Sequence, residues 1–240
     1  MAQFEFVARN LGNFLIGFPG HRPGGLLMSL ILTVVGFSIG LVVALVVAAT
    51  RDSGSRVVRA ASSAYIRVVS GIPLILLLLL THQFMAGRTA PGLDPAVTSA
   101  LLTLVLYSGA YQGDIFAAGF RGVPDAVVDD ARLLGCKPWQ VFALVKVPHS
   151  LRVMQPALVS QAITLFKDSS VVVILGVADL TTTARIALGS DVTNAPHWVA
   201  TYLTVGVIYF LVALTLSRGA HRWEQASPSR GSVRAASRIG

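Results

Sequence analysis

Residues 25–50 form an apolar run in which no side chain is charged. A helix rises about 1.5 Å per residue, so this run is long enough to cross the ~30 Å hydrocarbon core of a bilayer. Only 12% of the whole chain is charged and 54% is hydrophobic, whereas soluble domains carry about a quarter charged residues. The run therefore predicts a membrane-spanning helix, and Gly36 and Gly40 within it predict a close helix contact.

Four further segments have the length and apolar character of membrane spans. Charged residues inside them are few: Arg67 near the start of one, Asp114 near the end of another, and Arg152 with the pair Lys167-Asp168 in a third. The sequence thus predicts an all-α membrane protein of about five spans within a transmembrane domain, residues 25–220. The expected spans are residues 25–50, 60–84, 95–120, 151–176 and 197–217.

The basic residues predict an orientation, because loops on the cytoplasmic side of a membrane carry an excess of Lys and Arg. One side holds Arg51, Arg56, Arg59, Arg121, Arg132, Lys137, Lys146, Arg218, Arg222, Arg230, Arg234 and Arg238. The other side holds Arg9, Arg22, Arg88 and Arg185. We expect residues 1–24 to lie outside the cell and the C-terminus in the cytoplasm. Residues 221–240, rich in Ser, Gly and Arg, should form a disordered basic tail.

The net charge of +8 follows from this membrane pattern and does not indicate a nucleic-acid partner. Cys136 is the single cysteine, which excludes disulfides and paired-cysteine metal sites within the chain. The sequence contains no P-loop, metal-ligand cluster or nucleophile elbow. We therefore expect no catalytic residues, no metal and no cofactor in this chain. Any ATP and Mg²⁺ should be bound by a separate ATPase subunit.

One segment, DDARLLGCKPWQVFALVKVP (residues 129–148), is charged although its flanks are apolar. Asp129 and Asp130 fall in the early turns of an expected helix, where the helix dipole favours acids. Gly135 can end that helix, Pro138 can start a second one, and Pro148 marks a further boundary. The pattern predicts two short helices in a cytoplasmic loop, residues 121–150. An ordinary amphipathic loop is an equally good interpretation of these residues alone.

The same segment resembles the EAA loop of permease subunits of ABC importers. Asp129 and Ala131 stand at its acid and second-alanine positions, Gly135 at its glycine, and VKVP (residues 145–148) at its I-x-L-P ending. Asp replaces Glu, Asp130 replaces the first alanine, and Val replaces Ile and Leu, while the spacing is kept.

This resemblance implies the type I ABC importer permease fold, in a bacterial cytoplasmic (inner) membrane. It also implies that the loop docks on a cytoplasmic ATPase and transmits its closure to the membrane helices. The implied partners are two ATPase subunits, a second identical or homologous permease and an extracytoplasmic solute-binding protein. The residues expected to couple the chain to the ATPase are Asp129, Asp130, Ala131, Gly135, Lys137 and Pro148.

Within that family the chain resembles the polar amino acid subfamily. The matching motifs are G-I-P-L at residues 71–74, G-A-Y at 109–111 with D-I at 114–115, K-D-S-S-V at 167–171 and G-V-A-D-L-T at 176–181. Ser70, Ala117 and Ser160 stand where the subfamily has two arginines and an asparagine, so three polar or charged groups of the subfamily pattern are replaced in this chain. A partner permease that carries those groups would fit the losses.

Ionisable groups inside membrane spans usually face a cavity or a partner. An amino acid carries one carboxylate and one ammonium group, which an acid and a base at mid-span can meet. The residues expected on the solute path are Asp114, Lys167, Asp168, Ser169 and Ser170. Alternatively, Lys167 and Asp168 form a structural contact, because adjacent helical residues point about 100° apart and do not easily face one ligand.

Two other functions compete with the importer. A self-sufficient secondary transporter or channel for small polar solutes predicts internal inverted repeats, which the sequence does not show. Such a protein would also have no use for a docking loop. A membrane scaffold would not need Lys167 and Asp168 inside a span.

Overall fold

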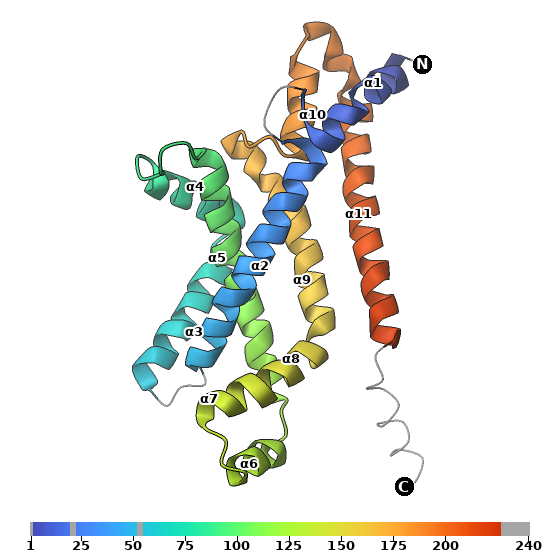
Figure 1. Cartoon of the computed structure of the whole chain (residues 1–240). Coiled ribbons are helices and arrows are strands. Elements are labelled where there is room, and N and C mark those ends of the chain that lie inside the picture. Colours follow the sequence, from blue (N-terminus) through green and yellow to red (C-terminus); the bar gives the residue numbers. More distant parts are fainter. Residues whose placement is uncertain (1, 20–22, 52–54, 227–240) are drawn as a thin grey trace.

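The computed structural model describes residues 2–19, 23–51 and 55–226, and side chains only up to residue 220 in the last range. The described elements are helices, as the sequence predicts, arranged as an elongated bundle (Figure 1). They are α1 (Ala2–Ile16), α2 (Gly25–Arg51), α3 (Arg56–Gly71), α4 (Leu74–Met85), α5 (Pro95–Arg121), α6 (Asp125–Leu133), α7 (Pro138–Val141), the π-helix η1 (Phe142–Lys146), α8 (Val147–Val153), α9 (Gln155–Asp168), the 3₁₀ helix η2 (Ser169–Leu175), α10 (Leu180–Gly189), the 3₁₀ helix η3 (Val192–His197) and α11 (Trp198–Ala226).

Helices α2 and α5 form the centre of the bundle and lie side by side (Figure 1). They run in the same direction, since Gly36 lies against Leu104 and Gly40 against Ser108. A Cβ atom added to Gly40 would lie 2.8 Å from the Ser108 Cβ, a separation that real side chains do not tolerate. The close contact predicted from the two glycines is therefore confirmed.

The second expected span is wrong as a single helix, because the chain bends by 110° between α3 and α4. Pro73 supplies the cause: it has no N–H to donate, and it restricts the residue before it to extended conformations. Ile72 has φ −92° and ψ 127°, as that restriction requires. The segment is therefore two helices that point in different directions, an arrangement found in broken spans and in re-entrant loops.

Three helices of the described chain are long and apolar enough to cross a membrane, and the bent pair α3–α4 adds a fourth. Helix α5 has the same length as α2 but carries more polar side chains, and it is not among them. Its buried polar residues bond within the helix, as Thr103 Oγ1 donates to the Ser99 carbonyl at 2.7 Å, and also to neighbouring helices, as Gln112 Nε2 donates to the Phe37 carbonyl of α2 at 3.3 Å. The structure thus supports three or four candidate spans where the sequence predicts about five, and it does not establish the predicted orientation of the termini.

Helices extend into both terminal segments, where the sequence predicts no membrane span. Residues 2–16 of the N-terminal segment form helix α1. The backbone of α11 remains helical to Ala226, six residues into the segment predicted to be a disordered tail. The rest of that predicted tail, residues 227–240, lies outside the described residues.

A buried polar junction fixes the starts of α2 and α10 and the middle of α11. The Gly25 N–H donates to the Ala178 carbonyl at 2.9 Å, and the Leu180 N–H donates to Ser29 Oγ at 3.3 Å. The fully buried Asp179 caps α10 by accepting from the Thr182 N–H at 2.8 Å. Its second oxygen accepts from the Tyr209 hydroxyl at 3.3 Å, so one carboxylate joins two helices.

Replacement of Gly40 by Ala tests the α2–α5 contact. Alanine gains up to ~1 kcal/mol of helix propensity over glycine, but overpacking a tight contact costs about 1–3 kcal/mol. Ser108 cannot move aside freely, because its Oγ accepts a bond from Gln112 Nε2 at 2.7 Å. We expect Gly40→Ala to lower the thermal midpoint in detergent, whereas Gly206→Ala, with nothing within 4 Å of the new atom, raises it or leaves it unchanged. A stabilised Gly40→Ala variant would contradict the contact.

Asp179 should make stability depend on pH. Burial raises the pKa of Asp179 above its ordinary value of 3.8, against the hydrogen bonds from Thr182, Thr181 and Tyr209, which lower it. A raised folded-state pKa gives stability that is complete below pH 3.8 and is lost as pH rises through the raised value. We expect Asp179→Asn to reduce the gain in thermal midpoint between neutral pH and about pH 4.5 relative to the parent. An unchanged gain would show that Asp179 does not titrate in this way.

Candidate ATPase-coupling surface and solute path

Helix α6 is held against the bundle by a small apolar cluster. Val128 and Ala131 of α6 are buried with Val123 and Val141. Asp130 and Leu134 are one turn apart and exposed, on the side of α6 roughly opposite to Val128. The helix therefore has an anchored side and a free side.

The end of α6 is fixed by a Schellman motif. The Gly135 N–H donates to the Arg132 carbonyl at 2.9 Å, and the Cys136 N–H donates to the Ala131 carbonyl at 3.0 Å. Gly135 has φ +83°, in the left-handed region that disfavours side chains with a Cβ. The predicted role of Gly135 in ending this helix is confirmed.

The second helix of the loop is longer than the sequence suggests. Helix α7 continues through η1 into α8 without a break, and Pro148 lies in the first turn of α8. It therefore marks the change from π-helix to α-helix and not the end of the helical segment. The proline has no N–H for the Leu144 carbonyl, and the preceding turn widens until the Val147 N–H donates to the Phe142 carbonyl. A proline can thus be accommodated without ending the helix.

The six residues predicted to couple the chain to an ATPase differ in exposure. Asp129, Asp130, Gly135 and Lys137 are exposed, and Asp129 pairs with Arg132 at 3.1 Å. Ala131 instead packs into the apolar cluster, and Pro148 is half-buried. Four of the six residues can therefore contact a partner directly, whereas Ala131 and Pro148 support the loop from within.

Sequence reasoning missed two surface residues. Leu133 and Leu134 are 86% and 84% exposed at the end of α6. An exposed apolar pair beside acids on the free side of a helix is typical of a docking surface. The signal was present in the sequence, since two leucines directly precede the helix-ending glycine.

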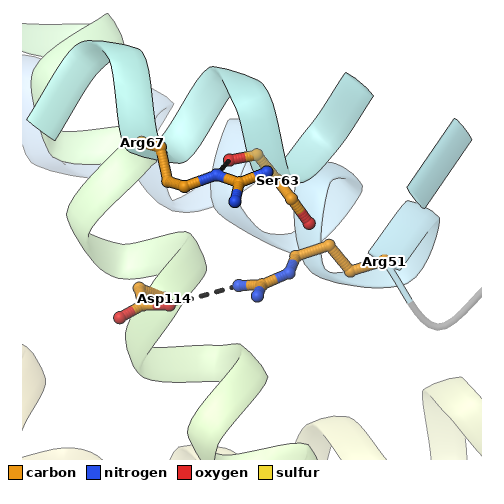
Figure 2. Close-up of polar contacts among 4 residues, drawn as sticks. All are labelled: Arg51, Ser63, Arg67 and Asp114. Atoms are coloured by element: carbon orange, nitrogen blue, oxygen red, sulfur yellow. Dashed lines mark hydrogen bonds and ion pairs between the residues drawn. The ribbon is translucent and has the colours of Figure 1, made fainter. Parts of the chain in front are cut away.

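Asp114 forms an ion pair with Arg51 at 3.1 Å, which links α5 to the end of α2 (Figure 2). The Asp114 side chain is 65% exposed and that of Arg51 is 25% exposed. Arg67 lies above this pair in Figure 2 but bonds within α3, where its Nε donates to the Ser63 carbonyl at 3.3 Å. Asp114 thus has a partner that the sequence did not reveal.

Lys167, Asp168, Ser169 and Ser170 lie where α9 changes into the 3₁₀ helix η2. Lys167 is exposed, Asp168 is half-buried, and the buried Ser169 Oγ donates to the Phe166 carbonyl at 2.7 Å. These four residues form one local group at a helix transition.

Two tyrosines of α5 lie next to this group. The rings of Tyr107 and Tyr111 are 4.7 Å apart, and the Tyr107 hydroxyl faces the Asp168 carboxylate. Sequence reasoning did not connect these tyrosines with Asp168. The carboxylate and the aromatic rings together could meet an ammonium group.

The structure separates Asp114 from the other residues of the predicted path. Leu165 of α9 lies near Gly36, whereas Gly113, next to Asp114, lies near Val47, eleven residues further along α2. At 1.5 Å per residue this spacing is about 16 Å along the bundle. Asp114 and the Lys167–Ser170 group therefore do not form one small binding site within this chain.

Among the described residues, no group of three or more His, Cys, Asp or Glu side chains is placed to hold a metal ion. The family of binding-protein-dependent transport system inner membrane components matches residues 36–226. The chain belongs to this family. It is a permease subunit of an ABC importer in the inner membrane, as its charged loop suggested.

Individual relatives agree with this assignment. The glutamate/aspartate import permease protein GltK of Escherichia coli O6:H1 is 31% identical, over 80% of this chain and 87% of its own length. The glutamine transport system permease protein GlnP of Escherichia coli K12 is 27% identical, over 80% of this chain and 86% of its own.

Solved structures support the type I permease fold. An amino acid ABC transporter crystallised with histidines has a TM-score of 0.73 at 30% identity, covering 85% of this permease and 92% of that chain. The inward-facing MetNI methionine ABC transporter has a TM-score of 0.64 at 19% identity, covering 92% and 97%, and supports the fold alone. Membership of the family implies an ATPase and a solute-binding protein as partners, and the permease is not itself an enzyme.

The helix end at Gly135 can be tested by hydrogen exchange. Nothing lies within 4 Å of a Cβ added there, so only the backbone conformation penalises a substitution. A β-branched residue with positive φ costs about 1–2 kcal/mol, whereas Asn tolerates this region. We expect Gly135→Val to speed exchange of the Cys136 amide about ten-fold and Gly135→Asn to change it little. Equal rates in the two variants would show that the motif does not hold α6.

Proposed function

We propose that this permease moves a polar amino acid into the cell and is driven by an ATPase that binds helix α6. The observation that carries the proposal is the construction of that helix. Its inner side is anchored by Val128 and Ala131, and its end is fixed at Gly135. Its free side displays Asp130 and Leu134 to solvent. A short helix held in this way can transmit a push to the bundle without bending.

The exposed surface of α6 includes apolar side chains that would be more stable against a protein partner than in water. Leu133 and Leu134 are almost fully exposed, and burying such side chains stabilises an interface by about 1.5–3 kcal/mol each. Asp129 and Asp130 lie one turn before these leucines, and their negative charges can attract a basic groove on the partner. The loop as a whole, residues 121–150, is therefore our proposed coupling element.

The relatives suggest the class of solute. They include permeases for glutamate and aspartate and for glutamine, all of which are polar amino acids. In this chain the Asp168 carboxylate and the rings of Tyr107 and Tyr111 offer partners for the ammonium group. Lys167, exposed on the adjacent face, offers a cation for the carboxylate. We place these residues on the solute path and expect Ser169 mainly to support the helix transition.

We propose five membrane crossings, with the N-terminus outside and the C-terminus in the cytoplasm. The parallel course of α2 and α5 supports this count, because the chain must cross back between them through α3 and α4. Helix α9 then returns, since its end lies near the start of α2. The bias of Lys and Arg toward one side supports the orientation.

The complete importer would contain more than this chain. We propose a second permease, identical or homologous, that closes the solute path, with two ATPase subunits and an extracytoplasmic binding protein. The ionisable path residues support this assembly, because exposed charges in a span need a partner or a water-filled cavity. A self-sufficient transporter or channel would give the exposed face of α6 no purpose.

The proposal is tested by amino acid uptake into proteoliposomes that contain the purified importer and its binding protein. We expect ATP-dependent uptake of glutamate, aspartate or glutamine. Leu134→Asp should reduce uptake and ATPase co-purification at least ten-fold, which corresponds to ~1.4 kcal/mol of docking energy. Leu93→Asp is the matched control, since Leu93 is a 59% exposed leucine outside α6, and it should retain both activities.

Uptake that proceeds without ATP or ATPase would favour the self-sufficient transporter. Normal coupling in Leu134→Asp would show that the ATPase does not use this face of α6.

A further inference from the structure

A cavity of about 550 Å³ lies between α6 and the ends of α2 and α5. Helix α3 and the π-helix η1 complete its walls. Its charged lining consists of Arg51, Arg59, Arg121, Arg132, Lys146 and Asp125. Five of these six side chains are cationic, and they come from segments far apart in the sequence.

The cavity remains positive after its acidic neighbours are counted. Asp114 pairs with Arg51 and Asp129 pairs with Arg132, each at 3.1 Å. With Lys146 left aside, these two acids and the one in the lining face four arginines, which leaves one positive charge. A group with one negative charge, such as a phosphodiester, would complete the balance.

The cavity does not coincide with the proposed ATPase-docking face. Asp125, Val128 and Arg132 line it and recur along one side of α6 at spacings of three and four residues. Asp130 and Leu134 lie on the other side of the helix, exposed to solvent. An ATPase bound to the free side of α6 would therefore not cover the cavity, which lies on the side of α6 that faces the bundle.

The surroundings of the cavity are those of a membrane interface. Arg59 follows Val57 and Val58, which are 79% and 38% exposed on α3. Exposed apolar side chains beside an arginine can receive an acyl chain while the arginine meets the headgroup. Basic pockets between helices on the cytoplasmic side of membrane proteins are suited to anionic headgroups.

We propose that this cavity binds the phosphate headgroup of an anionic phospholipid from the cytoplasmic leaflet. The inference rests on the proposed function, which places this end of the bundle at the cytoplasmic face. A lipid held there would lie between α6 and the helices it moves, so lipid composition would affect how well docking is transmitted. Free phosphate offers the same chemistry, and the experiment separates the two sources.

The test measures lipid retention by native mass spectrometry of the full-length permease purified with its partners. The protein is first equilibrated with mixed phosphatidylglycerol and phosphatidylethanolamine nanodiscs. We expect the parent to retain phosphatidylglycerol in preference to phosphatidylethanolamine. The double variant Arg59→Gln with Arg121→Gln should reduce that preference about twenty-five-fold, since each basic residue near an anionic membrane surface contributes about five-fold.

Two controls keep the result specific. Arg67→Gln with Arg218→Gln removes the same charge from exposed positions outside the cavity and should retain the lipid. Arg59→Lys with Arg121→Lys preserves the charge and should also retain it, which shows that loss in the Gln variant is not misfolding. An equal loss in the Arg67 and Arg218 variant would overturn the site, because general surface charge would then explain retention.

The source of the phosphate is decided by competition. Excess inorganic phosphate should not displace phosphatidylglycerol from the parent protein. Displacement, or binding of inorganic phosphate alone that the Arg59 and Arg121 variant abolishes, would overturn the lipid and identify a soluble anion. Lipid retention is measured separately from amino acid uptake. Normal uptake without a preference for phosphatidylglycerol therefore refutes only the lipid site. Absent uptake with the preference intact counts instead against the proposed importer.

Discussion

The contact between α2 and α5 is the interaction on which the rest of the bundle depends. It is close because Gly40 and Gly109 present no side chain where Ser108 and Val43 approach. In a bilayer the hydrophobic effect does not drive helices together, so packing of small residues and buried hydrogen bonds must do so. Helices α3 and α9 pack on both members of this pair, α4 and α8 pack on α5, and α1 and α10 pack on α2. Helix α6 lies beyond the far end of the pair (Figure 1).

Polar groups inside the bundle serve two different purposes. Asp179, Ser29 and Tyr209 bond to one another and to backbone groups, and so they fix where α2, α10 and α11 meet. Lys167 and Asp168 lie instead at a helix transition where the chain is less regular. The contrast is physical: a buried group with several partners specifies structure, whereas an accessible ionisable group remains available to a solute.

The loop between α5 and α9 carries the two proposed recognition surfaces on opposite sides of one short helix. Its free side carries Asp130 and Leu134, and its other side closes the basic cavity with Arg132. A rigid element with a protein partner on one face and a headgroup on the other would connect the ATPase with the membrane. That arrangement needs the exact end at Gly135, because a frayed helix would separate the two faces.

The sequence by itself determined the helical class, the helix end at Gly135 and the family, because apolar composition, glycine position and loop spacing are local signals. Only the tertiary structure decided that α3 and α4 are two helices bent by 110°, that Ala131 faces inward, and that Asp114 pairs with Arg51 far from Lys167. The basic cavity also belongs to this second group. Such contacts join residues that are distant in the chain, and their geometry follows from how helices pack, which no local pattern records.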